Sequence, residues 1–480
     1  MVEDVTNLQQ LSEEIEQLAS ENGLWSRGDT VVAAVSGGPD SMALLLTLHH
    51  ISTVLTPLKL VCAHVHHGFR QESDQEAQLV EALCARLAIP FEMAVVDVPA
   101  YIRESGRNAQ DAARSKRYAF LFEIAGKYRA RSIALAHHGD DQAETVLMRL
   151  LRGSGPSGLS GMKLIRLQDG IQLIRPFLRR SKADLVAICR QSGVDYAVDD
   201  SNEQTKYRRN AVRLQVLPFL EEYNPRISSS LVQTAEIIGS EDDYMESAAQ
   251  EAYTALVQKG AYGPAMSAPS FLALHVALQR RLIKLILNYL SPDREISDFT
   301  KIELIRRRIA QDISNSWSLD LGEGICCIRE YDTVSFMNGP PVCLNYIYEL
   351  HSPQELELLL PEIQRRLKLE LWDEARLESH PRMLNAEAFF DADHLHFPLI
   401  VRSRQPGDKM KLMGLNGSKK VKDILINEKI PPSARQAIPI VCDGLGTLIW
   451  IPGVRRSVHA AVGQHTTRIL RLTLSDAGEA

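Results

Sequence analysis

A short turn rich in glycine and serine, Ser36–Ser41, directly follows an apolar run at Thr30–Val35. Its two glycines, Gly37 and Gly38, would let the backbone approach an anion closely. Pro39 suits the first turn of a helix, because its ring presets φ and the N–H that it lacks would have no partner there. Backbone N–H groups at such a helix start point outward and carry partial positive charge. These features predict a phosphate-binding loop whose contacts come from Ser36, Gly37, Gly38, Pro39, Asp40 and Ser41.

The acidic residue inside this turn, Asp40, cannot bind a phosphate directly. A carboxylate at that position indicates a magnesium ion or a cationic group of the substrate, so Asp40 is also a candidate metal ligand. The turn lacks the Gly-Lys-Ser/Thr ending of a Walker A loop and is not Gly-x-Gly-x-x-Gly. The alternative is a strand-to-helix turn that needs glycine only for its geometry, but the serines and the aspartate favour a phosphate loop.

Two further carboxylates, Asp141 and Glu144, stand three residues apart after a predicted strand at Ser132–Ala136 and a His-His pair. On a helix this spacing puts both on one face. There they could hold one amine or one metal ion, and an amine must lose a proton before it acts as a nucleophile. A solvated helix face is the alternative, but the position after a strand favours a functional role.

Two histidines, His64 and His137, lie where predicted strands end. Ligands of open parallel sheets bind beyond the carboxyl ends of the strands, so both are candidates for nucleotide contacts. A purely structural role is equally open for each. The His-His pairs of the chain lack the i, i+4 spacing with a glutamate that a zinc-binding helix has, which argues against zinc.

The glycine-rich loop resembles the pyrophosphatase signature of the N-type ATP pyrophosphatase (PP-loop) superfamily. Further motifs follow in order, and together they resemble the tRNA-isoleucine lysidine synthetase family. They are His64–Arg70, Asn108–Tyr118, His137–Thr145, Arg149 with Arg152–Gly155 and Gly158, Asp200–Asn202, and Tyr207–Asn210 with Arg213. The resemblance is strong over the N-terminal domain, weak through the middle of the chain, and returns at Arg402–Asp408 and Gly453–Arg455.

The resemblance implies an ATP-dependent ligation of L-lysine to the wobble cytidine of an isoleucine tRNA that carries a CAU anticodon. ATP would adenylate the cytosine C2 oxygen with release of pyrophosphate. The lysine ε-amine would then attack C2 and displace AMP, which gives lysidine. ATP and Mg²⁺ are the cofactors implied, and the tRNA and L-lysine are the partners.

The resemblance also assigns roles to residues. Asp40, Asp141 and Glu144 would be catalytic, together with Arg114, which could neutralise the ATP phosphates or the departing pyrophosphate. The phosphate loop, His64 and His137 would contact the nucleotide. Residues that would contact the tRNA are Arg149, Arg152, Arg208, Arg209, Asn210, Arg213, Arg402, Arg404, Lys409, Lys419 and Lys420. Each arginine alone could equally be an ordinary surface residue.

Two other readings remain open. Some PP-loop enzymes transfer sulfur to tRNA bases, usually with a catalytic cysteine or an iron–sulfur cluster, and this chain has no Cys-x-x-Cys pair among its seven cysteines. A non-catalytic tRNA-binding protein with a decayed loop is the other, and the intact loop and carboxylates argue against it. Incorporation of lysine or of sulfur, and AMP release dependent on tRNA, would separate the three.

Composition sets broader limits. Hydrophobic residues make up 45% and charged residues 24% of the chain, as in soluble globular proteins. The net charge of −6 argues mildly against a nucleic-acid partner, although local basic patches decide such binding. The sequence contains no apolar stretch of the roughly 20 residues that cross a bilayer. We expect a cytoplasmic protein without a membrane partner, and a homodimer is one arrangement open to it.

Strand and helix patterns alternate over the first part of the chain, which predicts a doubly wound, mainly parallel sheet with helices on both faces. Long helical patterns follow at Ser228–Leu256, Phe271–Leu290 and Thr300–Ile309, and a hairpin pattern at Ser316–Phe336. The expected domains are a PP-loop catalytic domain at 1–215, a mainly helical tRNA-binding domain at 216–338, and a small mixed α+β tRNA-binding domain at 339–480.

Overall fold

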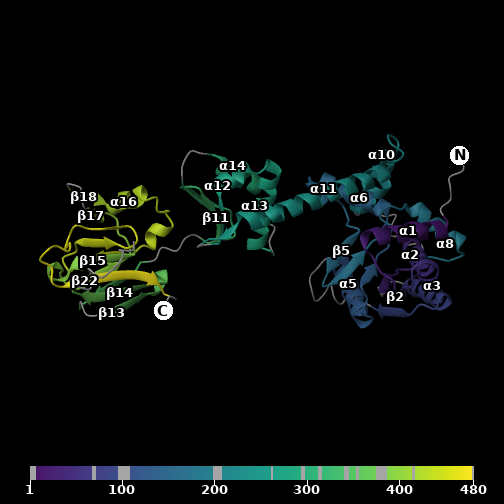
Figure 1. Cartoon of the computed structure of the whole chain (residues 1–480). Helices are drawn as coiled ribbons and strands as arrows, with labels where there is room; N and C mark the ends of the chain where they lie inside the picture. The colour runs from purple at the N-terminus through teal and green to yellow at the C-terminus, as the bar shows by residue number, and fades with distance from the viewer. Residues whose placement is uncertain are drawn as a thin grey trace. The chain divides into compact units, whose positions relative to one another are not determined.

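The computed structural model describes residues 7–66, 72–95, 109–197, 208–260, 263–292, 298–311, 316–339, 345–352, 356–373, 386–412 and 417–477. The chain packs as two compact units, 1–245 and 246–480 (Figure 1). Each unit is described by itself.

The first unit is built on a six-stranded sheet with the order β3-β2-β1-β4-β6-β5. Its strands are β1 (Thr30–Ala34), β2 (Lys59–His66), β3 (Phe91–Val95), β4 (Ser132–Ala134), β5 (Ile165–Gln168) and β6 (Ile171–Ile174). All pairs are parallel except β5 with β6 at the edge. The chain runs outward from β1 to β3 and then returns to β4 on the other side of β1. The switch point of the sheet, where such folds bind ligands, therefore lies between β1 and β4.

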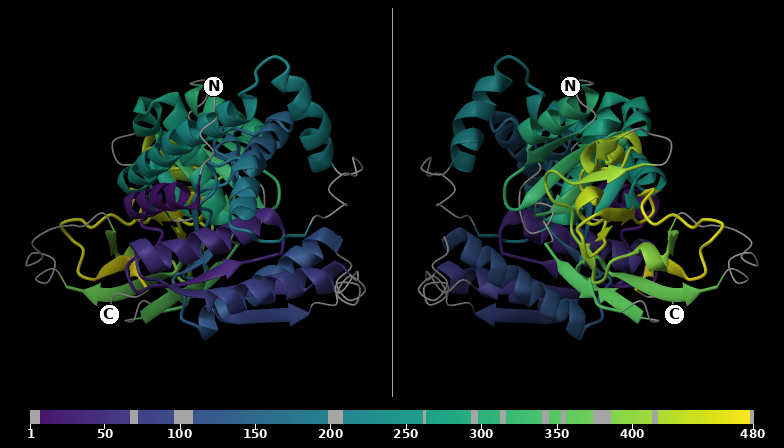
Figure 2. Two further views of the ribbon diagram at one scale, coloured as in Figure 1. Left: turned by 90° about the vertical axis from the view of Figure 1, so that its right-hand side faces the viewer. Right: turned by 90° about the vertical axis from the view of Figure 1, so that its left-hand side faces the viewer.

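Helices cover both faces of this sheet. The helices of this unit are α1 (Leu8–Asn22), α2 (Pro39–His50), α3 (Glu72–Leu87), α5 (Ala109–Lys127), α6 (Gly139–Leu151), α7 (Pro156–Leu159), α8 (Lys182–Gln191), α9 (Arg208–Ala211), α10 (Leu217–Glu221) and most of α11 (Ile227–Leu256), with π-helical turns at Ile51–Leu55 and Val212–Val216. Alternate residues of β1 point to opposite faces: Val31 and Ala33 pack with α1, α2 and α8, whereas Val32 and Ala34 pack with α5. Figure 2 gives two side views of these purple and blue elements.

The second unit contains antiparallel sheets. The first has the order β7-β8-β11-β10-β9, and its strands are β7 (Gln258–Lys259), β8 (Pro264–Ser267), β9 (Ser316–Asp320), β10 (Ile325–Glu330) and β11 (Thr333–Asn338). Its core includes side chains of α12 (Ala268–Ala273), α13 (Val276–Leu290) and α14 (Phe299–Ala310).

The remaining strands of this unit form three more antiparallel sheets with the orders β12-β16-β19-β20-β21, β13-β14-β22-β15 and β17-β18. They are β12 (Ile347–Leu350), β13 (Leu356–Leu360), β14 (Arg365–Trp372), β15 (Glu387–Asp391), β16 (Leu399–Arg402), β17 (Lys409–Lys411), β18 (Ser418–Lys420), β19 (Ile440–Cys442), β20 (Leu448–Ile451), β21 (Arg455–Arg456) and β22 (Ile469–Asp476). One helix, α16 (Val421–Asn427), packs beside β17 and β18.

The predicted fold class is confirmed, but the middle of the chain differs in detail. Its helices share a core with the five-stranded sheet, which the helical patterns did not predict. The helix expected over Phe271–Leu290 is two helices, because Leu274 is extended and His275 caps α13 by accepting a hydrogen bond from the amide of Ala277. The division into two units does not test the domain boundaries expected at 215 and 338, which stay predictions. Throughout the described ranges, no helix has both the length and the apolar character that a bilayer span requires.

Candidate active site at the switch point

The glycine-rich turn lies where β1 ends and α2 begins. Gly38 is the N-cap residue in an extended conformation, and Pro39 occupies the first helical position, as expected. The Ser36 amide donates to Ser41 Oγ at 3.1 Å, and Ser41 Oγ donates to the Gly38 carbonyl at 2.9 Å. These bonds fold the turn back on itself. The amides of the first helical turn have no acceptor within the helix, so they suit an anion.

The carbonyl oxygens of Gly37, Gly38 and Pro39 each accept a hydrogen bond. The Gly37 carbonyl accepts the amide of Ala197 at 3.0 Å, and the Pro39 carbonyl accepts the thiol of Cys189 on α8 at 3.3 Å. The Gly38 carbonyl also accepts the amide of Met42 at 3.0 Å. Helix α8 and the segment after it therefore support the turn from behind.

Gly37 combines a positive φ of 95° with close packing, because an added Cβ would lie 3.1 Å from Glu76 Cβ on α3. A Gly37→Ala variant should cost about 1–2 kcal/mol in backbone strain alone and weaken ATP binding. Gly38 has a negative φ, and its added Cβ would meet only Ser36 Oγ at 3.8 Å. Gly38→Ala should therefore unfold at the wild-type temperature in calorimetry, whereas Gly37→Ala should unfold lower. Equal unfolding temperatures would contradict the strain argument.

A buried histidine, His138, joins the two sides of the switch point. It precedes α6 and is 2% exposed. Its Nε2 lies 3.5 Å from Asp40 Oδ2 of the phosphate loop and 3.5 Å from Asp141 Oδ2 of α6, and its Nδ1 lies 3.3 Å from Asp140 Oδ2. Burial alone would lower the pKa of His138, but the three carboxylates outweigh it and raise that pKa to about 10. His138 is therefore a cation at neutral pH.

His137 has the opposite character. Burial lowers its pKa to about 4, and although Asp141 opposes this shift, Arg175 and Arg117 add to it. It is neutral at pH 7, and within the described part of the chain its Nδ1 has no hydrogen-bond partner. It follows β4, as predicted, so it could donate or accept a hydrogen bond beside the loop. The other predicted histidine, His64, is 1% exposed and its Nδ1 lies 2.9 Å from the Val35 carbonyl.

Asp141 and Glu144 lie on one face of α6, as the spacing predicted, but two arginines are paired with them. Glu144 is 0% exposed, and its oxygens accept Nε of Arg209 at 2.7 Å and Nε of Arg213 at 2.5 Å. Asp141 Oδ1 accepts Nη2 of Arg209 at 3.0 Å and lies 3.4 Å from Nη2 of Arg213. Burial disfavours the charged form of Asp141, but His138 and Arg209 outweigh this and lower its pKa. Both arginines were expected to contact tRNA, and that role stays a prediction.

The start of α6 is held by a capping box and by close packing. Asp141 Oδ2 accepts the amide of His138 at 3.2 Å. The amide of Gly139 donates to the Arg180 carbonyl at 2.7 Å, and an added Cβ on Gly139 would lie only 2.9 Å from that oxygen. Asp140 Oδ2 accepts the amide of Lys182 at the start of α8 at 2.7 Å. Sequence reasoning did not assign roles to His138 and Asp140, although both stand inside the His137–Thr145 motif.

Asp40 offers a free acceptor for a cation. Its Oδ1 is buried without a hydrogen-bond partner among the residues that the structure describes, while its Oδ2 faces His138. A single carboxylate beside a phosphate site fits Mg²⁺, which commonly takes one or two protein carboxylates together with phosphate oxygens and water. Across the same described residues, no three His, Cys, Asp or Glu side chains form a complete protein-only metal site.

The remaining predicted arginines of this unit are spread around the site. Arg114 on α5 is exposed, with its guanidinium 5.2 Å from the ring centre of Tyr118. Arg149 Nη1 donates to the carbonyls of Gly158 and Gly161, both at 2.7 Å, and so holds the loop after α6. Arg152 and Arg208 are exposed and Asn210 is half-buried. Their tRNA contacts stay predictions.

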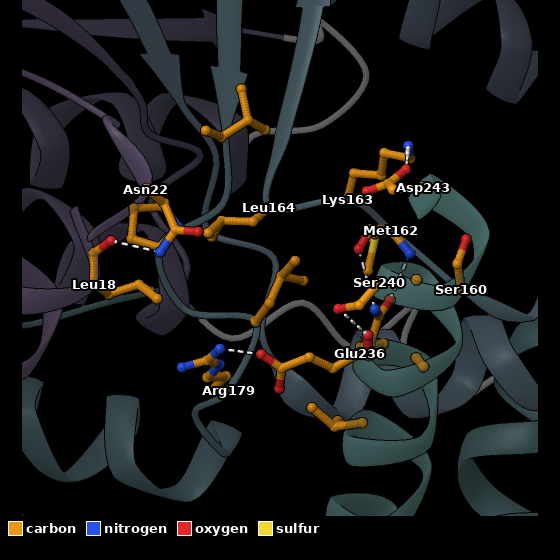
Figure 3. Close-up of a pocket in the computed structure, with 17 residues that line it drawn as sticks. Leu18, Asn22, Ser160, Met162, Lys163, Leu164, Arg179, Glu236, Ser240 and Asp243 are labelled. Atoms are coloured by element: carbon orange, nitrogen blue, oxygen red, sulfur yellow. Dashed lines mark hydrogen bonds and ion pairs between the residues drawn. The ribbon is translucent and has the colours of Figure 1, made fainter. Parts of the chain in front are cut away.

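A separate cavity of about 320 Å³ lies between α1, the segment before β5, and α11 (Figure 3). Two ion pairs stand at it, Lys163 with Asp243 and Arg179 with Glu236. Gln142 of α6 lines it and exchanges hydrogen bonds with the backbone of Met162 at 3.1 and 2.7 Å. None of the predicted catalytic or nucleotide-binding residues lines this cavity.

In the second unit, the predicted basic residues divide into two groups. Arg402 is largely buried and makes two hydrogen bonds with Asp408 at 2.7 and 3.0 Å. Lys409 and Lys420 face each other across β17 and β18, and both are exposed. Lys419 and Arg404 are half-buried. Like charges directly opposite on a sheet repel one another. The tRNA contacts expected for these residues stay predictions.

Comparison with known proteins agrees with this geometry. Residues 7–220 match a family model described as PP-loop domain, and residues 399–472 match one described as TilS substrate C-terminal domain. The chain is 39% identical to tRNA(Ile)-lysidine synthase of Bacillus licheniformis over 437 residues, which cover 90% of each chain. It is 36% identical to the Geobacillus kaustophilus protein of that name over 465 residues, 94% of this chain and 96% of that one. A crystal structure of a TILS C-terminal domain is 32% identical, covers 28% of this chain and 100% of that chain, and has a TM-score of 0.25.

The glycine-rich turn at the start of α2 and the carboxylates of Asp140, Asp141 and Glu144 on α6 lie on either side of the switch point of the parallel sheet. The similarity to the two relatives extends over nearly the full length of each. The chain belongs to the tRNA(Ile)-lysidine synthase family.

Proposed function

We propose that the chain ligates L-lysine to C2 of the wobble cytidine of isoleucine tRNA with a CAU anticodon. In the first step the cytosine C2 oxygen attacks the α-phosphorus of ATP, an O–P bond forms, and pyrophosphate leaves. In the second step the lysine ε-amine attacks C2, a C–N bond forms, the C2–O bond breaks, and AMP leaves. The ε-ammonium loses one proton to become a nucleophile and a second as the C–N bond is completed, and the product is lysidine.

One observation carries this proposal: the phosphate-binding turn and the carboxylates of α6 are joined by a single side chain. Asp40 and Asp141 both lie 3.5 Å from His138 Nε2. A nucleotide on the amides of the turn and an amine on Asp141 would therefore sit on adjacent sides of one small site. That is the geometry that adenylation followed by attack of an amine requires.

Mg²⁺ would be held by Asp40 together with the phosphates of ATP. When bound, it supplies positive charge that offsets the negative charge of the departing pyrophosphate. Arg114 and the amides of the turn would add to this stabilisation from the protein side. Asp40 thus has a role in binding rather than in proton transfer.

The lysine ε-ammonium would bind at Asp141. That carboxylate is 16% exposed, whereas Glu144 is fully enclosed and has both oxygens on arginines. We infer a division of labour in which Asp141 receives the amine and Glu144 holds Arg209 and Arg213 beside it. A charge-assisted hydrogen bond of about 1.5–3 kcal/mol would favour lysine over neutral analogues.

The hairpin of β17 and β18 would form part of the tRNA-binding surface. A variant with Lys419 and Lys420 of β18 and Lys422 of the adjoining helix α16 changed to glutamine should bind tRNA more weakly at low salt, and its binding should depend less steeply on salt, because fewer counterions are released. Filter binding between 50 and 300 mM salt measures both. A matched variant with Lys59, Lys127 and Lys163 changed to glutamine removes the same number of positive charges and should retain the salt dependence of the wild type. An unchanged slope in the hairpin variant would remove this surface from the tRNA interface.

The decisive experiment incubates the purified chain with ATP, Mg²⁺, labelled lysine and unmodified isoleucine tRNA, followed by nucleoside analysis. We expect label in lysidine and one AMP for each lysine incorporated. Label in the tRNA without AMP, or AMP without label, would contradict the two-step reaction. We also propose that the chain works in the cytoplasm, and sedimentation of the purified protein would test the homodimer.

A further inference from the structure

His138 and Asp140 take part in neither chemical step of the proposed reaction, yet they lie at the centre of the site. His138 is 2% exposed, and each of its ring nitrogens faces a carboxylate. Asp140 and Asp141 are its charged neighbours at the start of α6, and the phosphate loop contributes Asp40. Carboxylate oxygens flank the ring at 3.3 and 3.5 Å, and burial leaves the ring little room to turn.

The support of His138 continues outward through Asp140. Asp140 Oδ2 accepts the amide of Lys182 at 2.7 Å and faces His138 Nδ1 at 3.3 Å. Lys182 is the first residue of α8, and that helix also contacts the phosphate loop through the bond from Cys189 to the Pro39 carbonyl. Helix α8 is thus connected to the turn twice, once through the thiol of Cys189 and once through Asp140 and His138.

We propose that Asp140 and His138 act as one positioning pair, which sets Asp40 of the nucleotide site relative to Asp141 of the amine site. Asp140 fixes the ring orientation, and the ring then fixes the distance between the two carboxylates. Where a carboxylate orients a metal-ligating histidine, its loss commonly costs about 10- to 100-fold in affinity or activity, and we expect an effect of similar size here. The proposal rests on the proposed function, since it assigns the two sides of the site to ATP and to lysine.

The test compares His138→Gln, Asp140→Asn and the double variant, in the full chain. Glutamine cannot donate from two sides, and asparagine keeps the bond from the Lys182 amide but loses the charge that faces the ring. We expect each single variant to weaken ATP binding and to raise the KM for lysine about tenfold or more. The double variant should be no worse than His138→Gln, because Asp140 acts through the ring.

Two readouts separate positioning from damage to the fold. ATP binding is measured by calorimetry without lysine or tRNA, and lysine KM is measured in the lysidine assay. A loss of folded protein would lower kcat and the binding stoichiometry but leave KM and Kd unchanged. His49→Gln, in the last turn of α2, is the matched control and should leave both constants as in the wild type. If His138→Gln does not fold, the Kd for ATP and the KM for lysine of Asp140→Asn alone test the proposal.

Wild-type constants in Asp140→Asn, or a double variant whose loss equals the product of the two single losses, would overturn the proposal. Failure of the proposed function would look different. In that case the wild-type chain would make no lysidine, while ATP binding would still report whether the pair positions Asp40.

Discussion

An Asp141→Asn enzyme should lose about 10- to 100-fold in kcat/KM for lysine, because one charge-assisted hydrogen bond to the ammonium of about 1.5–3 kcal/mol becomes a neutral one. The loss should appear as a raised KM for lysine. ATP binding should persist, since the phosphate loop is untouched. Steady-state kinetics with lysine varied at saturating ATP and tRNA measures the effect.

The control for this variant is Asp169→Asn, in the turn between β5 and β6. Asp169 has a φ of 50°, a conformation that asparagine also tolerates, and it lies outside the site. It should keep wild-type kinetics. If Asp141→Asn also kept them, the amine would have to bind elsewhere, and Asp141 would serve only to cap α6.

Glu144→Gln is expected to destabilise the first unit strongly. The change leaves the guanidinium groups of Arg209 and Arg213 beside a neutral amide, and breaking a buried ion pair costs about 3–5 kcal/mol. Because the two arginines are 41% and 28% exposed and can recover some hydration, we expect a loss of about 2 kcal/mol or more. The temperature of unfolding in calorimetry reports it.

Glu236→Gln provides the comparison. Glu236 pairs with Arg179, but both side chains are about half exposed at 46% and 54%. Exposed pairs contribute about 0–1 kcal/mol, so this variant should unfold close to the wild-type temperature. Equal shifts for the two variants would mean that the enclosed carboxylate of Glu144 contributes no more than a surface pair.

The architecture of the first unit could be predicted because its signals are local. The apolar run before Ser36–Ser41 and the helix after it depend only on neighbouring residues, and the structure has them within a few positions of the predicted bounds. The helix α1 was not predicted, although Leu11, Ile15 and Leu18 carry its buried face at helical spacing. Asn7, which accepts the amide of Gln10, was the available capping signal.

The middle of the chain was harder for a physical reason. Strands β7 and β8 are only two and four residues long, and β8 gains its place by pairing with β11, more than sixty positions away in the chain. Short strands carry almost no periodicity of their own. Ser316–Phe336 was predicted as a pair of strands, but it contains most of three, since the turn at 331–332 separates β10 from β11.

The sequence predicted which residues form the site, but it did not predict which side chains pair with one another. The spacing of Asp141 and Glu144 identified one helix face, and the turn identified the anion site. Arg209 and Arg213 reach that face from 65 to 72 positions along the chain. No local pattern specifies such a contact, so the same arginines were assigned to the tRNA. The central position of His138 could not be predicted for the same reason, because its partner Asp40 lies in the first turn of α2, which follows a different strand.

The supports behind the phosphate turn also determine which sign of charge it accepts. The oxygens of Gly37, Gly38 and Pro39 each accept a hydrogen bond from within the protein, so the backbone of the turn offers its amides to a ligand. The acceptor for a cation is the Asp40 carboxylate, whose Oδ1 has no hydrogen-bond partner among the described residues, so we expect a cation to bind beside the phosphates of ATP rather than in their place. The enzyme can thus hold two substrates of opposite charge a few ångströms apart without either occupying the other's place.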